Sequence, residues 1–136
     1  MIEITVNGGS RNQRKYAESM AYYCIKKFLS KHKTLNLTID LKQMRNDENY
    51  GYCCHLDGRD FEVEVKRTLK LRDMLTTLAH EMVHVKQYVL GEMPEDISSG
   101  DYWDMPHEIE AHGREVGLFI RWAETNRLSH HKWTQL

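Results

Sequence analysis

The sequence predicts an α+β fold in which a small, mainly antiparallel sheet packs with an N-terminal helix and two later helices. Alternating apolar and polar residues indicate short strands before residue 67. Apolar residues at steps of three and four indicate one helix between the first two strands and two helices after the last strand. A length of 136 residues with 40% hydrophobic side chains is typical of a globular domain. We therefore expect one domain that covers residues 1–136.

The N-terminal part reads as strand, helix and strand. Residues 2–6 alternate apolar and polar side chains, which predicts a first strand. Ser10 and Gln13 have the spacing of a capping box, so we expect a helix from Arg11 to about Lys31. Residues 37–41 alternate again and predict a second strand.

A polar loop at residues 45–49 and a β-hairpin should follow. The dipeptide Asp57-Gly58 is a favoured two-residue turn, and it fixes a register for the strands on either side. Pairing outward from that turn predicts one apolar face made of Cys54 opposite Phe61, Tyr52 opposite Val63, and Tyr50 opposite Val65.

The next helix should be capped by Thr68 and end at Gly91. Its buried stripe is predicted to consist of Leu71, Leu75, Leu78, Met82, Val85 and Val89. A second stripe on another face consists of Thr77, His80, His84 and Gln87. The two histidines therefore do not belong to the main core stripe.

The last helix should open at Asp104 and Pro106, after a long connection over residues 91–104. Its predicted buried stripe consists of Ile109, Val116, Ile120 and Ala123. On another face lie Glu108, His112 and Glu115.

Composition restricts the function. The net charge of −1 disfavours a general nucleic-acid binder, and no apolar run approaches the ~20 residues of a membrane span. The first residues do not resemble a secretory signal, and three cysteines, an odd number, suit reduced thiols in a cytoplasmic protein. The stretch 91–110 holds seven carboxylates and no Lys or Arg. That stretch is either an acidic rim that favours basic substrates or, as we expect, a solvated acidic loop.

The chemistry is indicated by His80-Glu81-Met82-Val83-His84, which has the pattern His-Glu-x-x-His. Two histidines one helical turn apart can bind the same zinc ion, and the glutamate between them suits a general base for bound water. A catalytic zinc usually has a third protein ligand. The segment Glu108-Ile109-Glu110-Ala111-His112 is its obvious source. Glu108 and His112 share one face of the predicted helix, whereas Glu110 lies on another face.

These two motifs resemble those of the gluzincin group of zinc peptidases, and residues 75–118 are similar to small SprT-like and phage-encoded metallopeptidases. The resemblance implies a zincin-like fold and a cytoplasmic location, which is the host cytoplasm for a phage-encoded protein. It implies that Glu108 is the third ligand and that His112 supports a ligand histidine by a hydrogen bond. SprT proteins use a third histidine instead, so His107 and His112 are rivals of Glu108.

We therefore expect a zinc-dependent peptidase, more an endopeptidase than an exopeptidase, that hydrolyses peptide bonds by a zinc-activated water with Glu81 as general base. Candidates for stabilising the oxyanion are Tyr102, His107, His112 and Arg114. A substrate should pair with the strand from Phe61 to Arg67, which the family layout places before the zinc helix. The alternative is a slow or inactive zinc-fold binding module, associated with DNA in the SprT-like manner.

Overall fold

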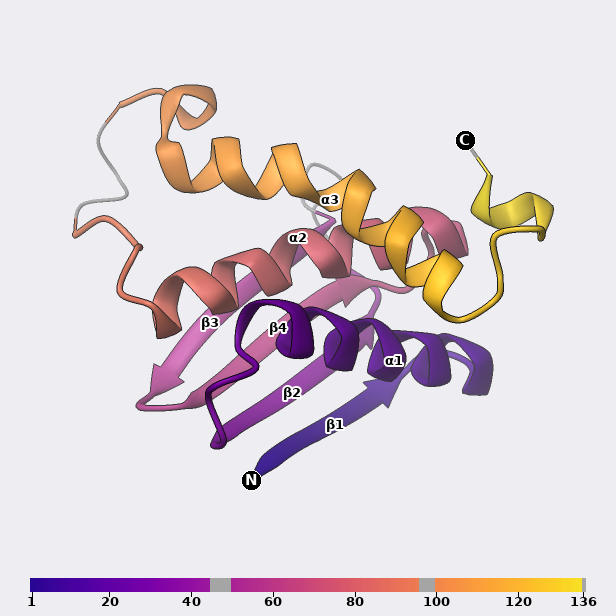
Figure 1. Ribbon diagram of the computed structural model, residues 1–136, viewed down its shortest axis with the longest axis horizontal. Helices are drawn as coiled ribbons and strands as arrows, with labels where there is room; N and C mark the ends of the chain where they lie inside the picture. The colour runs from indigo at the N-terminus through magenta and orange to yellow at the C-terminus, as the bar shows by residue number, and fades with distance from the viewer. Residues whose placement is uncertain (45–49, 96–99, 136) are drawn as a thin grey trace.

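The computed structural model describes residues 1–44, 50–95 and 100–135, so the loop expected at 45–49 lies outside the described residues. It confirms an α+β architecture of three helices and a four-stranded sheet (Figure 1). The elements are β1 (Ile2–Gly8), α1 (Arg11–Phe28), β2 (Leu35–Lys42), β3 (Gly51–Asp57), β4 (Asp60–Lys66), α2 (Leu71–Val89) and α3 (Pro106–Thr125), with short 3-10 turns η1 (Tyr102–Asp104) and η2 (Lys132–Thr134). No helix within these ranges is long and apolar enough to cross a membrane.

The sheet is mixed, with the strand order β1-β2-β4-β3. β1 pairs with β2 and β2 with β4 in parallel, and only the β3–β4 hairpin is antiparallel. The expected mainly antiparallel sheet is therefore wrong. The cause is α1, which carries the chain back to the end of the sheet at which β1 begins, so that β2 runs parallel to β1.

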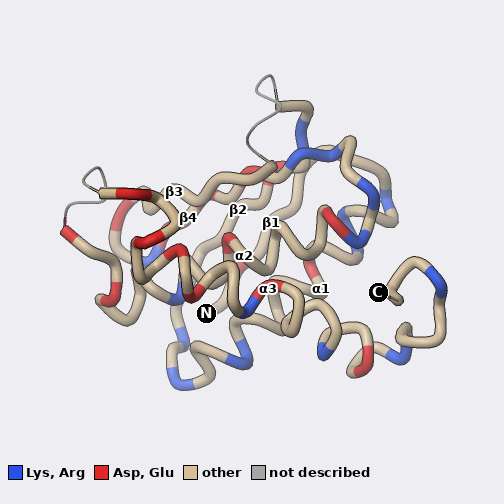
Figure 2. The backbone as a smooth tube through the Cα atoms, turned by 90° about the horizontal axis from the view of Figure 1, so that it is seen from above, with Lys and Arg blue, Asp and Glu red and all other residues tan. Residues whose placement is uncertain are grey.

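All three helices lie on one side of the sheet (Figures 1 and 2). α1 and α2 pack directly on its apolar face, and α3 lies across α2 (Figure 1). β2 is representative, since Leu35, Leu37, Ile39 and Leu41 are buried beneath the helices while the residues between them point to the other side. α2 is thus covered by the sheet on one side and by α3 on the other, which buries two of its faces.

The hairpin register differs from the prediction by one residue. Its turn consists of Gly58, in the left-handed region at φ 49°, and Arg59, and an irregularity between His55 and Asp57 changes the alternation. The inward positions of β3 are therefore Gly51, Cys53 and His55, paired with Val65, Val63 and Phe61. Tyr52, expected in the core, is 57% exposed. The shift turns a glycine, and not a tyrosine, toward α2.

Helix α1 begins with the predicted capping box of Ser10 and Gln13 but ends at Phe28, short of Lys31. Helix α2 begins at Leu71, and its N-cap is Lys70 without a side-chain cap, so Thr68 does not cap it. Gly91 has φ 71° and reverses the chain after α2, as predicted. The buried stripe of α2 is confirmed from Leu75 through Val85.

The predicted buried stripe of α3 is wrong at Ile109, which is 56% exposed, and at Val116, which is 44% exposed, whereas its last member, Ala123, is buried as predicted. The buried apolar residues are Ala111, Leu118, Phe119, Trp122 and Ala123. The face of α3 that meets α2 begins with polar residues, Glu108 and Glu115, so a search for apolar periodicity alone selects the neighbouring stripe.

Candidate metal centre

His80 and His84 lie one turn apart on the face of α2 that α3 covers, and both are buried. Their rings are 4.9 Å apart and meet edge to face. The burial follows from the three-layer packing, since this face of α2 is turned away from the sheet and toward α3. The predicted pair is thus placed between two helices with both rings directed at the same space.

Glu108, in the first turn of α3, meets both histidines. Its Oε1 lies 3.2 Å from His80 Nε2 and 3.0 Å from His84 Nε2. Two donors bound to a tetrahedral zinc at 2.0–2.1 Å are about 3.3 Å apart. Each of these two nitrogen–oxygen distances is therefore close to the distance between two ligands of a single zinc ion.

The opposite ring nitrogens are held by acceptors on neighbouring turns. His84 Nδ1 lies 2.7 Å from Gln87 Oε1, and Gln87 Nε2 donates to the carbonyl of His107 and to Glu110 Oε1. Because the amide nitrogen is fully used, the amide oxygen accepts from His84 Nδ1, so in the neutral ring the lone pair is on Nε2. That tautomer is the one a metal requires from His84.

Glu115 has the corresponding place beside His80. Its Oε1 lies 3.4 Å from His80 Nδ1 and 2.8 Å from His112 Nδ1. The expected direct support from His112 is therefore wrong, because His112 reaches the ligand histidine through Glu115. Sequence reasoning placed Gln87 and Glu115 on the right faces but gave neither a role. The sequence feature that could have indicated these roles is a spacing of three residues. It places Gln87 one helical turn beyond His84, and Glu115 one turn beyond His112.

His112 remains near enough to be considered as a ligand. One donor atom each from His80, Glu108 and His112 lies within 4.8 Å of the others, so these three residues could also hold a metal ion. Both ring nitrogens of His112 are already engaged, Nδ1 with Glu115 and Nε2 with the Tyr102 hydroxyl at 2.9 Å. We therefore favour His84 over His112, since the Nε2 of His84 has Glu108 as its hydrogen-bond partner.

Protonation follows from these contacts when no cation is bound. Burial lowers the pKa of His80, but hydrogen bonds to Glu108 and Glu115 outweigh burial and raise it to about 9. The pKa of His84 is also raised, since burial is outweighed by hydrogen bonds to Glu108 and Gln87. Burial raises the pKa of Glu108, but the two histidines hold it below its usual value. A bound cation would replace these protons.

Glu81 is buried at 6% exposure and lies beneath β3. Burial raises its pKa to about 7, although the two histidines act in the opposite direction. A Cβ at position 51 would lie 3.0 Å from Glu81 Oε2 and 2.7 Å from Thr77 Cγ2, so Gly51 is needed for the close approach of β3 to α2.

A cleft extends to both sides of Glu81. Two hollows share Gly51, His80, Glu81 and Tyr102 as lining residues. One continues over Tyr52, Cys53, His84, Tyr88, Met93, His107 and Glu108, with a cavity volume of about 260 Å³. The other continues over Tyr50, Thr77, His112 and Glu115, with about 190 Å³. An extended chain can therefore pass Glu81 with space on either side.

Of the remaining candidates for stabilising the oxyanion, Tyr102 and His107 line the cleft and Arg114 does not. Tyr102 lines both hollows, and His107 lines the first, with a buried Nδ1 that lacks a hydrogen-bond partner within the described structure. Burial lowers the pKa of His107. Arg114 is not in the site, because it donates to Glu110 Oε2 at 3.0 Å and packs over the Phe28 ring. It is therefore wrong as a candidate for the oxyanion.

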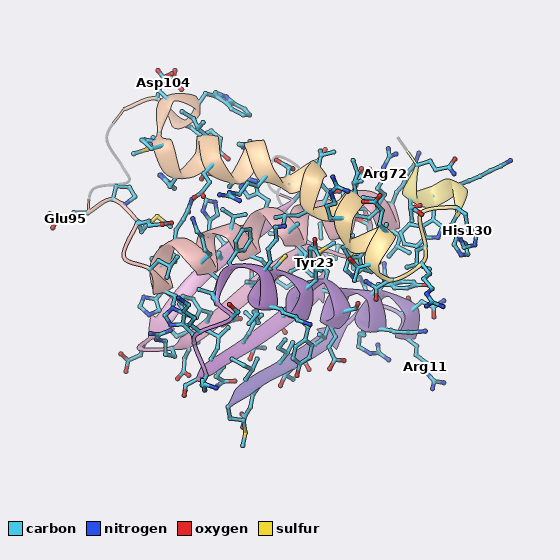
Figure 3. All side chains as sticks on the ribbon, in the orientation of Figure 1. Arg11, Tyr23, Arg72, Glu95, Asp104 and His130 are labelled. Atoms are coloured by element: carbon cyan, nitrogen blue, oxygen red, sulfur yellow. The ribbon has the colours of Figure 1, made fainter. Side chains whose placement is uncertain are left out.

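The expected substrate strand is also wrong. β4 lies between β2 and β3, so both of its backbone edges are paired, whereas β3 is an edge strand beside α2. The acidic stretch agrees only in part with a solvated loop, because Glu92 and Glu110 pair with Lys86, and Glu108 contacts the two histidines. Glu95 and Asp104 are exposed, and Figure 3 shows them pointing away from the side chains between α2 and α3.

Comparison with protein-family models, with curated proteins and with solved structures gave no significant match. The assignment of this site therefore depends on its geometry and on the chemistry of its side chains.

Proposed function

We propose that the protein is a zinc-dependent peptidase. The observation that carries the proposal is that Glu108 Oε1 lies 3.2 Å from His80 Nε2 and 3.0 Å from His84 Nε2, beside a buried glutamate that lines a cleft. Two imidazoles and one carboxylate are a donor set of catalytic zinc sites, in which three protein ligands leave a position for water.

The donor set fits zinc better than it fits a purely structural ion-pair cluster. Both Nδ1 atoms are paired with acceptors, Gln87 Oε1 and Glu115 Oε1, which directs each Nε2 toward Glu108. Ligand histidines in zinc sites are commonly oriented in this way. Zinc bound there would supply a water of lowered pKa and polarise a substrate carbonyl.

Glu81 is the proposed general base. Its carboxylate lies in the cleft between the two hollows, and so within reach of a group bound beside His80 and His84. In the proposed reaction one carboxylate oxygen of Glu81 accepts a proton and then donates it to the leaving amine. The Tyr102 hydroxyl lines the same cleft and is the proposed donor to the carbonyl oxygen.

The substrate is proposed to lie along β3. The far side of this strand has no pairing partner among the described strands, and the strand passes directly over Glu81 at Gly51. Main-chain hydrogen bonds to such an edge bind an extended peptide without regard to its sequence. Space on both sides of Glu81 favours cleavage within a chain over removal of a terminal residue.

The test compares wild-type protein with Glu81→Gln and with Glu124→Gln, both loaded with zinc, on a mixed peptide library. Glu124 is a matched control because it is exposed and pairs with Arg121 far along α3. We expect at least about 100-fold slower cleavage by Glu81→Gln and unchanged cleavage by Glu124→Gln. Equal cleavage by all three proteins, or none by any, would favour the non-enzymatic zinc module.

A further inference from the structure

The hollow on the His84 side of the cleft differs in chemistry from the hollow on the other side. Beyond the shared residues it is lined by His84, His107 and Glu108 of the candidate metal centre and by a wall of Tyr52, Cys53, Tyr88 and Met93. The opposite hollow is walled by Tyr50, Thr77, His112 and Glu115. The wall outside the candidate metal centre is therefore mainly apolar on the His84 side of Glu81, and the lining of the opposite hollow is mainly polar, so a bound peptide meets two different environments.

The apolar wall is held in place by the chain around it. Gly91 reverses the backbone after α2 at φ 71°, and Glu92 N donates to the Gln87 carbonyl at 2.8 Å. Lys86 Nζ adds ion pairs of 2.7 Å to both Glu92 and Glu110. These contacts fix the segment that places the half-buried Met93 over the hollow. The wall is thus built onto α2 and α3, the helices that carry the metal ligands.

The charges in this hollow disfavour ionic side chains. Neither hollow is lined by a Lys or Arg within the described residues, so an acidic side chain would have no cation to pair with. Burial raises the pKa of the Cys53 thiol well above its usual value, so Cys53 is a neutral wall residue. An apolar side chain gains free energy by leaving water against the wall of Tyr52, Cys53, Tyr88 and Met93, whereas a charged side chain loses hydration and finds no opposite charge on these four residues.

We propose that the hollow of Tyr88, Met93 and Cys53 selects substrates that carry a large apolar side chain next to the bond that is cleaved. This inference rests on the proposed peptidase function and specifies its substrate class. Such a pocket discriminates between a large and a small apolar side chain by about 10-fold to 100-fold in kcat/KM.

The test uses the zinc-loaded protein and paired peptides that differ only in leucine or alanine at each position near the cleaved bond. We expect one position at which leucine raises kcat/KM about tenfold or more, while lysine and glutamate lower it. Met93→Lys should reduce the leucine preference about threefold or more, and the control Met93→Leu should keep it. Equal cleavage of the leucine and alanine peptides, or an unchanged preference in Met93→Lys, would overturn the inference.

Binding provides a second arm that does not depend on turnover. Fluorescence anisotropy of the labelled peptides with zinc-loaded Glu81→Gln should show tighter binding of the leucine peptide, and equal affinities would overturn the pocket assignment. Cleavage that depends on Glu81 but shows no apolar preference contradicts this inference alone. Absence of Glu81-dependent cleavage contradicts the proposed function, while the binding arm still decides whether the pocket is selective.

Discussion

Replacing Glu108 by Gln tests the third ligand directly. The substitution keeps the shape of the side chain but removes the charge of the one carboxylate that lies within 3.2 Å of both His80 Nε2 and His84 Nε2. Loss of a residue that only orients a ligand costs 10–100-fold in metal affinity. Loss of a charged ligand should exceed that range, so we expect zinc affinity to fall more than about 100-fold, or about 2.7 kcal/mol.

His112→Gln is the matched comparison, because His112 contacts Glu115 and Tyr102 and lacks a hydrogen bond to His80, His84 or Glu108 among the described contacts. We expect it to lower zinc affinity less than about tenfold. The assay is competition with a chromogenic chelator at about pH 7 and about pH 9, which separates metal binding from proton competition at the histidines. A larger loss in His112→Gln than in Glu108→Gln would refute the assignment of Glu108.

Two further outcomes follow from the same contacts. Gln87→Leu removes the acceptor 2.7 Å from His84 Nδ1 and should lower zinc affinity about 10-fold to 100-fold in the same competition assay, and an unchanged affinity would contradict its orienting role. In zinc-free protein the raised pKa of His80, about 9 when folded, gives stability that is fully present below about pH 6.5 and is lost as the pH rises toward 9. Urea unfolding with a chelator should therefore show a falling free energy of unfolding over this range, by up to about 1.4 kcal/mol per pH unit, whereas a rising free energy would contradict the ion-pair geometry.

Much of the fold follows from local sequence signals. The capping box at Ser10, the apolar stripe of α2 and the reversal at Gly91 depend on residues near one another in the chain, and the structure has all three. The order of the strands does not follow from local signals. It depends on α1, which returns the chain to the end of the sheet at which β1 begins. A prediction that treats successive strands as hairpins does not detect this crossover.

The hairpin shows a second limit. Asp57-Gly58 and Gly58-Arg59 are both acceptable turns, and a change of one residue exchanges every inward side chain for its neighbour. A tertiary contact favours the observed register, because a Cβ at position 51 would lie 2.7 Å from Thr77 Cγ2 and 3.0 Å from Glu81 Oε2. The error therefore occurred at a position where the sheet meets the candidate site.

The site itself was predictable where one helix determines the spacing. The His80 and His84 pair follows from the period of α2, whereas the shared face left both Glu108 and His112 as candidates, and the resemblance to gluzincins selected Glu108. The supporting roles of Gln87 and Glu115 depend on how α2 and α3 lie against each other. The exclusion of Arg114 depends on its partners Glu110 and Phe28, which sequence spacing does not give.

Metal analysis of His84→Ala and His112→Ala, each beside wild-type protein, tests the central claim most directly. His84 distinguishes the proposed site from the alternative group of His80, Glu108 and His112. We predict one zinc per wild-type chain, retained by His112→Ala and lost by His84→Ala. Zinc retained by His84→Ala and lost by His112→Ala, or no zinc in wild-type protein supplied with the metal, would contradict the account.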